Sequence, residues 1–116
     1  PPRIDMELVL RVQRLASAPD PMALLAVLPT SSPSIGRDRL DRSGPTIETV
    51  FDEGPDDPEY AIEVTYDGSY ELDEEILVDG TRLDAHLGVM GGWISSILVK
   101  VGDVAWDFLP TLDGTD

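Results

Sequence analysis

The chain has 116 residues, of which 41% are apolar, no cysteine, and a formal net charge of −15 at pH 7. Without cysteine it forms no disulfide, holds no metal through thiolates and has no thiol nucleophile. Strong acidity argues against direct binding to nucleic acid or to an anionic membrane. The length suits one domain, so we expect a single domain over 1–116, and the lack of cysteine favours a cytoplasmic location.

Charge is divided unevenly along the chain. Residues 1–45 carry six Arg and five Asp or Glu, a balance of +1. Residues 46–116 carry Arg82, Lys100 and eighteen Asp or Glu, a balance of −16. Compressing so much like charge opposes folding, so the asymmetry indicates either a use for the acidic half or an environmental cause such as a very salty cytoplasm.

The first segment with a clear period is 4–13. Apolar residues stand at every second position from Ile4 to Val12, and mostly polar residues lie between them. This two-residue period predicts a half-buried strand. A helix is the competing interpretation, because Ile4, Leu8 and Val12 also share one helical face.

A short helix is predicted over 21–28, followed by a long loop. Asp20 can cap the first turn, Pro21 suits the first helical position, and Pro29 ends the helix. Residues 29–45 are rich in Pro, Ser and Gly and carry three of the Arg. We expect a loop there because of this composition. Loops of this length are uncommon in compact domains unless they bind something or are disordered.

From Thr46 onwards the sequence indicates antiparallel strands. Strands are expected over 46–51 and 59–66, and two-residue turns at Asp67-Gly68 and Asp79-Gly80. A third hairpin is predicted with one arm at 97–101 and the other at 104–108.

The stretch 81–90 shows helical spacing, and the pair Gly91-Gly92 is expected to end a short helix there. The tail 112–116 is polar and expected to fray. Together the elements predict an α+β fold, a mostly antiparallel sheet with one or two short helices packed on it. A ferredoxin-like β-α-β-β-α-β order fits, and a curved β-meander around one helix is the alternative.

His86 is the single histidine. The sequence shows no Gly-x-Ser-x-Gly elbow that would complete a triad with it, so the simpler interpretation is a surface or helix-end histidine. Arg37, Arg39 and Arg42 suggest phosphate binding, but adjacent Asp residues weaken their field. We therefore expect these Arg to pair with carboxylates of the acidic half, 46–116, and we predict no catalytic residue, cofactor or metal site.

Acidic residues gather in two stretches, 52–59 and 71–75. Neither has the ligand register of a calcium loop, and the sequence cannot place any carboxylate pair at a catalytic separation. Trp93 follows two glycines and could be an exposed anchor, since Trp is enriched in interface hot spots. The predicted partner-binding residues are Asp52, Glu53, Asp56, Asp57, Glu59, Glu71, Asp73, Glu74, Glu75 and Trp93.

These features favour a small, non-catalytic protein that covers a basic protein partner. In size and charge it resembles bacterial immunity proteins, which neutralise toxins such as nucleases, or an inhibitor that mimics nucleic acid; no motif carries that resemblance to particular residues. A structural or self-assembling subunit, for which a homodimer would suffice, is one alternative. A small enzyme using His86 and a carboxylate is another.

Overall fold

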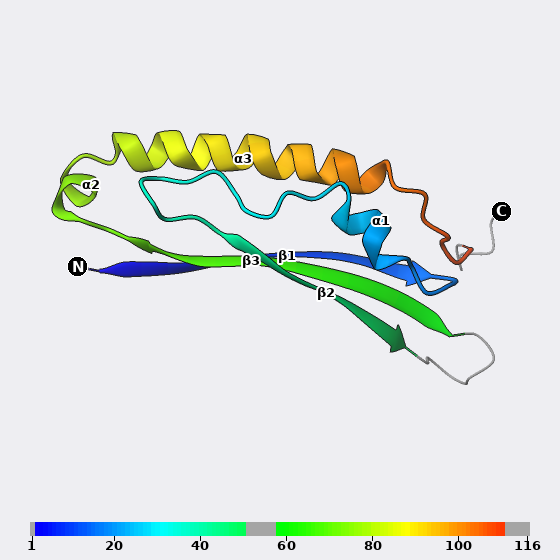
Figure 1. Cartoon of the computed structure of the whole chain (residues 1–116). Coiled ribbons are helices and arrows are strands. Elements are labelled where there is room, and N and C mark those ends of the chain that lie inside the picture. The colour runs from blue at the N-terminus through cyan, green and yellow to red at the C-terminus, as the bar shows by residue number, and fades with distance from the viewer. Residues whose placement is uncertain (1, 51–57, 111–116) are drawn as a thin grey trace.

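The computed structural model describes residues 2–50 and 58–110 and has an α+β fold. A three-stranded antiparallel sheet in the order β1-β3-β2 carries its helices on one face (Figure 1). The elements in chain order are β1 (Arg3–Leu15), α1 (Pro21–Leu25), β2 (Asp41–Val50), β3 (Glu59–Glu71), α2 (Glu74–Val78) and α3 (Thr81–Gly102).

The strand predicted from the two-residue period is confirmed as β1, and its alternation sets the inner face of the sheet. Leu8 and Leu10 lie opposite Tyr66 and Val64 of β3, and all four pack in the core. Leu15, Ile62 and Ile97 are fully buried in the same core, which lies between the sheet and α3.

The short helix is confirmed and ends earlier than expected. Asp20 accepts a hydrogen bond from the amide of Met22 at 3.0 Å, and Pro21 opens α1. The loop predicted over 29–45 is too long, because β2 begins at Asp41. A bulge at Gly44-Pro45, a cis peptide with Gly44 at φ 93°, separates the part of β2 that the loop prediction covered from the strand predicted at 46–51.

Two of the predicted hairpin turns are wrong. Asp67 and Gly68 lie inside β3, which continues to Glu71, and Asp79-Gly80 joins α2 to α3. A Cβ at Gly68 would lie 2.2 Å from the carbonyl oxygen of Arg39. Glycine is therefore needed there so that the segment before β2 can approach the strand closely.

The hairpin predicted between 97–101 and 104–108 is also wrong, because α3 continues through Gly91-Gly92 to Gly102. His86, Met90 and Ile97 are buried at helical spacing along its inner side. Gly88, Gly91 and Gly92 meet no atom within 4 Å of an added Cβ. Their cost of about 1 kcal/mol each is offset by burial of the opposite side.

The first five elements of a ferredoxin-like order are present as β1, α1, β2, β3 and α3, and α2 is added between the last two. The final strand of that order is not found among the described residues. A single bridge between Leu15 and Phe108 stands in its place, with Ala16 donating to the carbonyl of Asp107. Beside that bridge, Trp106 packs against the core, and Phe108 is 54% exposed.

By length and composition alone, α3 is long and apolar enough to cross a membrane. A single such helix is weak evidence for a membrane span. One side of it is packed on the sheet through its buried residues. Leu87, Leu98 and Val99 remain exposed on α3.

Candidate functional site: the open face of the sheet

The helices and the segment between α1 and β2 lie over one face of the sheet, and the opposite face is left uncovered among the described residues (Figure 1). We call this second surface the open face. Because side chains alternate along a strand, residues between the core-facing positions of each strand lie on it. Its carboxylates are Asp5, Glu7, Asp41, Glu48, Glu59, Glu63, Asp67 and Glu71.

One row of carboxylates crosses all three strands of the open face. Glu7 of β1 and Asp41 of β2 are both direct partners of Asp67 on β3. Direct partners in an antiparallel sheet have Cα atoms about 5 Å apart. Like charges in that position destabilise a sheet, so the row by itself opposes folding.

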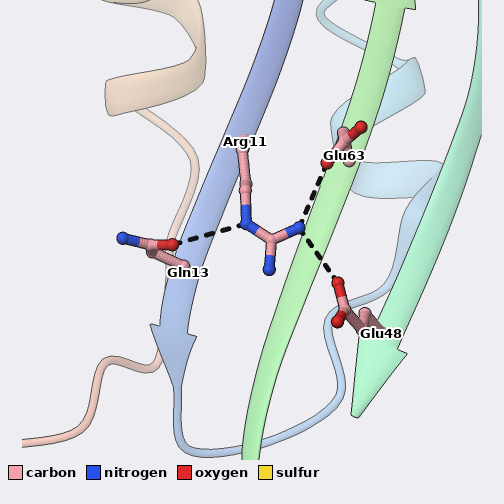
Figure 2. A network of polar contacts seen from close by, with 4 residues as sticks. All are labelled: Arg11, Gln13, Glu48 and Glu63. Carbon is pink, nitrogen blue, oxygen red and sulfur yellow. Dashed lines mark hydrogen bonds and ion pairs between the residues drawn. The ribbon is translucent and has the colours of Figure 1, made fainter. Parts of the chain in front are cut away.

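Arg11 is a cation near the middle of the open face, and two carboxylates share it (Figure 2). Its Nη1 lies 3.0 Å from Oε2 of Glu48 and 3.1 Å from Oε2 of Glu63, and its Nε donates to Gln13. The hydrogen bond with Glu48, then that with Glu63, raises the pKa of Arg11. One guanidinium facing two carboxylates leaves the group with a negative balance.

Other carboxylates of the open face also have polar partners. Asp5 accepts a hydrogen bond from the hydroxyl of Ser69, and Asp41 lies 3.0 Å from Nε of Arg39. Glu59 lies 3.9 Å from Arg14. The open face is therefore partly neutralised, and its acidic side chains still outnumber Arg3 and Arg11, the basic residues that alternate onto it.

The structure distributes the predicted partner-binding residues over several places. Asp52, Glu53, Asp56 and Asp57 lie outside the described residues. Glu59 and Glu71 both lie on the open face but at opposite ends of β3, about 40 Å apart at the rise of a strand. Because most of the first acidic stretch lies outside the described residues, the combination of the two stretches into one surface stays a prediction.

Three further members of that prediction lie beyond the sheet. Glu74 and Glu75 are exposed in the first turn of α2, and Asp73 immediately precedes that helix. Trp93 is half-buried on α3, with its ring edge-on to Tyr66 at a centroid distance of 5.0 Å. Trp93 thus packs against the core, and it is not part of the open face.

Sequence reasoning missed most of the open face. The alternation of Asp5, Glu7 and Arg11 along β1 was visible, whereas the pairing of Glu7 with Asp67, and of Asp67 with Asp41, depends on strand order. No local signal in the sequence specifies that β3 lies between β1 and β2.

His86 is not the surface residue that the sequence suggested. His86 lies on α3 and its side chain is buried on the inner side of that helix, with Nε2 3.3 Å from the hydroxyl of Tyr70. Burial lowers the pKa of His86 and raises that of Tyr70. The charge of Asp38 raises the pKa of Tyr70 further, after burial, and the alternative of a small enzyme using His86 and a carboxylate stays a prediction.

The Arg-rich segment forms a pocket of about 420 Å³ near the end of β3, lined by Ser34, Gly36, Arg37, Asp38, Arg39, Asp41 and Ser69. Arg39 is paired with Asp41, and Arg42 points elsewhere, donating to the carbonyl of Leu28 at 2.8 Å. The three Arg therefore do not converge. Within residues 2–50 and 58–110, no group of three His, Asp or Glu residues is placed to hold a metal ion.

Comparison of the chain with protein-family models, with curated proteins and with solved structures finds no match. The open face is thus interpreted from its own chemistry. A sheet that displays carboxylates in register sets up a negative potential over that face, which attracts cationic groups and repels anionic ones.

Proposed function

We propose that this chain is an acidic, non-catalytic binding protein that covers a basic protein partner with the open face of its sheet. The observation that carries the proposal is the row Glu7–Asp67–Asp41, in which three strands contribute carboxylates at adjacent positions. Such a row is unfavourable for the isolated sheet. A cationic partner would turn the repulsion into attraction.

The partner's chemistry follows from the shape and charge of this surface. The carboxylates of the open face are spread over three strands and are mostly exposed, which suits the surface of a folded protein better than a small molecule, since small-molecule sites are concave. Lys and Arg on the partner would replace solvent around the carboxylates. An inhibitor that occupies a cationic cleft in place of nucleic acid, such as that of a nuclease toxin, has this chemistry.

The test compares two variants that carry the same change in charge. Glu7→Gln, Asp41→Asn and Asp67→Asn together neutralise the row. Glu74→Gln, Glu75→Gln and Asp84→Asn together neutralise exposed carboxylates on α2 and α3. Binding of each to a panel of purified cationic proteins, nuclease toxins included, would be measured by calorimetry at about 0.05 M and about 0.5 M salt.

We expect the wild type to bind at least one member of the panel, and to bind it more weakly at high salt. The row variant should lose about tenfold or more in affinity, and the helix variant should keep its affinity within about twofold. Equal losses in the two variants would show that bulk charge alone is responsible. Either that result or an absence of binding at low salt would contradict the proposal.

A further inference from the structure

The outer edge of β1 is the longest regular strand edge without a described neighbour. β1 is at one end of the sheet and pairs with β3 alone, in unbroken register from Arg3 to Val12. In a β-α-β-β-α-β order the final strand would lie at this edge. Among the described residues, the backbone around Phe108 pairs there, and it reaches only Arg14 to Ala16.

The two edges of the sheet differ in how they are protected. The β2 edge is interrupted by the bulge at Gly44-Pro45, and bulges and prolines are common devices against strand addition. Residues 3–12 of β1 contain neither proline nor bulge. A long regular edge of this kind is a template for another strand.

The core is also incomplete on this side. Leu8, Leu10 and Val12 are only partly buried, whereas their partners on β3, Tyr66, Val64 and Ile62, are completely buried, and Met6 is also only partly buried. On the open face Val9 is 44% exposed, with Thr65 as its direct partner. Another strand beside β1 would cover apolar side chains on both faces.

We propose that two copies of this chain associate through the outer edges of their β1 strands, antiparallel about a two-fold axis at Val9. The two three-stranded sheets would become one continuous sheet. A two-fold interface must be self-complementary, with residue i against residue j and j against i, and the sequence of β1 satisfies this condition at Val9.

The pairing at this axis matches both charge and polarity. Glu7 faces Arg11 of the second copy and Arg11 faces Glu7, so the contact occurs twice. On the inner face Leu8 meets Leu10, and Met6 meets Val12. Glu7 lies beside Asp67 within its own chain, so a guanidinium from the second copy would neutralise the end of the acidic row. Opposite charges directly across strands are stabilising.

In the single chain the Arg11 guanidinium lies toward β3 and β2, where Nη1 contacts Glu63 and Glu48 and Nε donates to Gln13 (Figure 2). Pairing with Glu7 of the second copy therefore requires Arg11 to exchange these contacts for the new one. A two-fold axis at Leu8 would instead leave Glu7 opposite Val9. It would also direct Arg11 to Asp5, which already accepts the Ser69 hydroxyl. The axis at Val9 is therefore favoured, and its paired segment, 5–13, stops short of the stretch covered by Phe108.

The first test is the solution mass of the full chain by sedimentation, together with charge variants. We expect a dimer for the wild type. We also expect a dimer for the control Glu75→Arg, which makes the same change in charge as Glu7→Arg but on α2. Val9→Lys would place like charges together at the axis, and Glu7→Arg would oppose Arg11. Each should raise the dimer dissociation constant about tenfold or more, while circular dichroism shows an unchanged fold.

The second test locates the axis. Because the wild type has no cysteine, Val9→Cys introduces one thiol per chain, and mild oxidation should give a covalent dimer. Thr65→Cys, on the adjacent strand, should stay monomeric on a denaturing gel. A monomeric wild type, or a dimer that Val9→Cys does not link, would overturn the proposal. So would a dimer disrupted by Val99→Lys on α3 and not by Val9→Lys, or association with neutral lipid vesicles instead of self-association.

Discussion

The buried imidazole of His86 has a consequence for stability that its sequence context did not reveal. It lies on the inner side of α3 against the Tyr70 hydroxyl, and burial lowers its pKa. In the unfolded chain a histidine takes up a proton near pH 6.5. Between that pH and the lower pKa of the folded state, the unfolded chain binds the proton and the folded chain does not, so stability falls as the pH falls.

We therefore expect the free energy of unfolding of the wild type, and with it the melting temperature, to fall as the pH is lowered from about 7.5 to about 5.5. For one proton the free energy falls by at most about 1.4 kcal/mol per pH unit. His86→Gln keeps a polar partner for Tyr70 and removes the titration, so its stability should be nearly flat over this window. Carboxylates titrate mainly below it. Parallel pH profiles for the two proteins, measured by thermal unfolding, would contradict the assignment.

A second residue-scale prediction concerns the close approach at Gly68. The carbonyl oxygen of Arg39 lies 2.2 Å from where a Cβ would be. The next two atoms, the carbonyl carbon of Arg39 and the Cα of Leu40, also belong to the backbone. Gly68→Ala must therefore displace backbone, at a cost of about 2–3 kcal/mol in the free energy of unfolding.

The matched control for Gly68 is Gly88→Ala on the outer side of α3, where an added Cβ meets nothing within 4 Å. Alanine favours a helix interior over glycine, so this variant should gain about 0.5–1 kcal/mol. Urea unfolding measures both changes. Equal effects of the two substitutions would show that the approach of Arg39 to β3 does not constrain position 68.

At the scale of the element, α3 shows how tertiary burial outweighs local preference. The start of the helix is supported by Asp79, whose carboxylate accepts a hydrogen bond from the amide of Thr81. The hydrogen bond with the Thr81 side chain, then that with its amide, lowers the pKa of Asp79. Lys100 in the last turn suits the helix dipole. The glycines in the middle would favour a break, yet burial of Met90 and Ile97 on either side holds the helix continuous.

The first turn of α1 offers an element-scale prediction. Asp20 caps it through the amide of Met22, and Leu24 carries the helix into the core. Asp20→Ala should cost about 1 kcal/mol in the free energy of unfolding. Asp20→Asn, which keeps a capping oxygen, should cost much less, and a loss of the same size in both variants would assign the effect to charge in place of capping.

At the scale of the whole molecule, the net charge of −15 opposes compaction. Salt screens this repulsion, because the Debye length falls from about 30 Å at 0.01 M to about 10 Å at 0.1 M. We expect the melting temperature to rise by roughly 4 °C, equivalent to about 1 kcal/mol, as NaCl is raised from about 0.01 M to about 0.5 M.

The variant with Glu7→Gln and Asp67→Asn should show a smaller rise at the same protein concentration, because two adjacent members of the acidic row are gone. A melting temperature that falls with salt would mean that ion pairs such as Arg11 with Glu48 and Glu63 outweigh the repulsion.

The sequence by itself determined the parts of this protein whose signals are local. The two-residue period of 4–13 specified β1, and Asp20-Pro21 specified the start of α1, because alternation and capping act within a few residues. The α+β class and the uneven charge were likewise readable along the chain.

The tertiary structure alone decided the rest. Asp67-Gly68 has the composition of a turn and became strand, because contact with Arg39 demands glycine at 68. Residues 97–101 have the composition of a strand but form the last part of α3. They do so because a continuous helix buries both Met90 and Ile97 against the sheet. The acidic row exists only because β3 lies between β1 and β2, and side-chain neighbours across strands are set by pairing over long sequence separations.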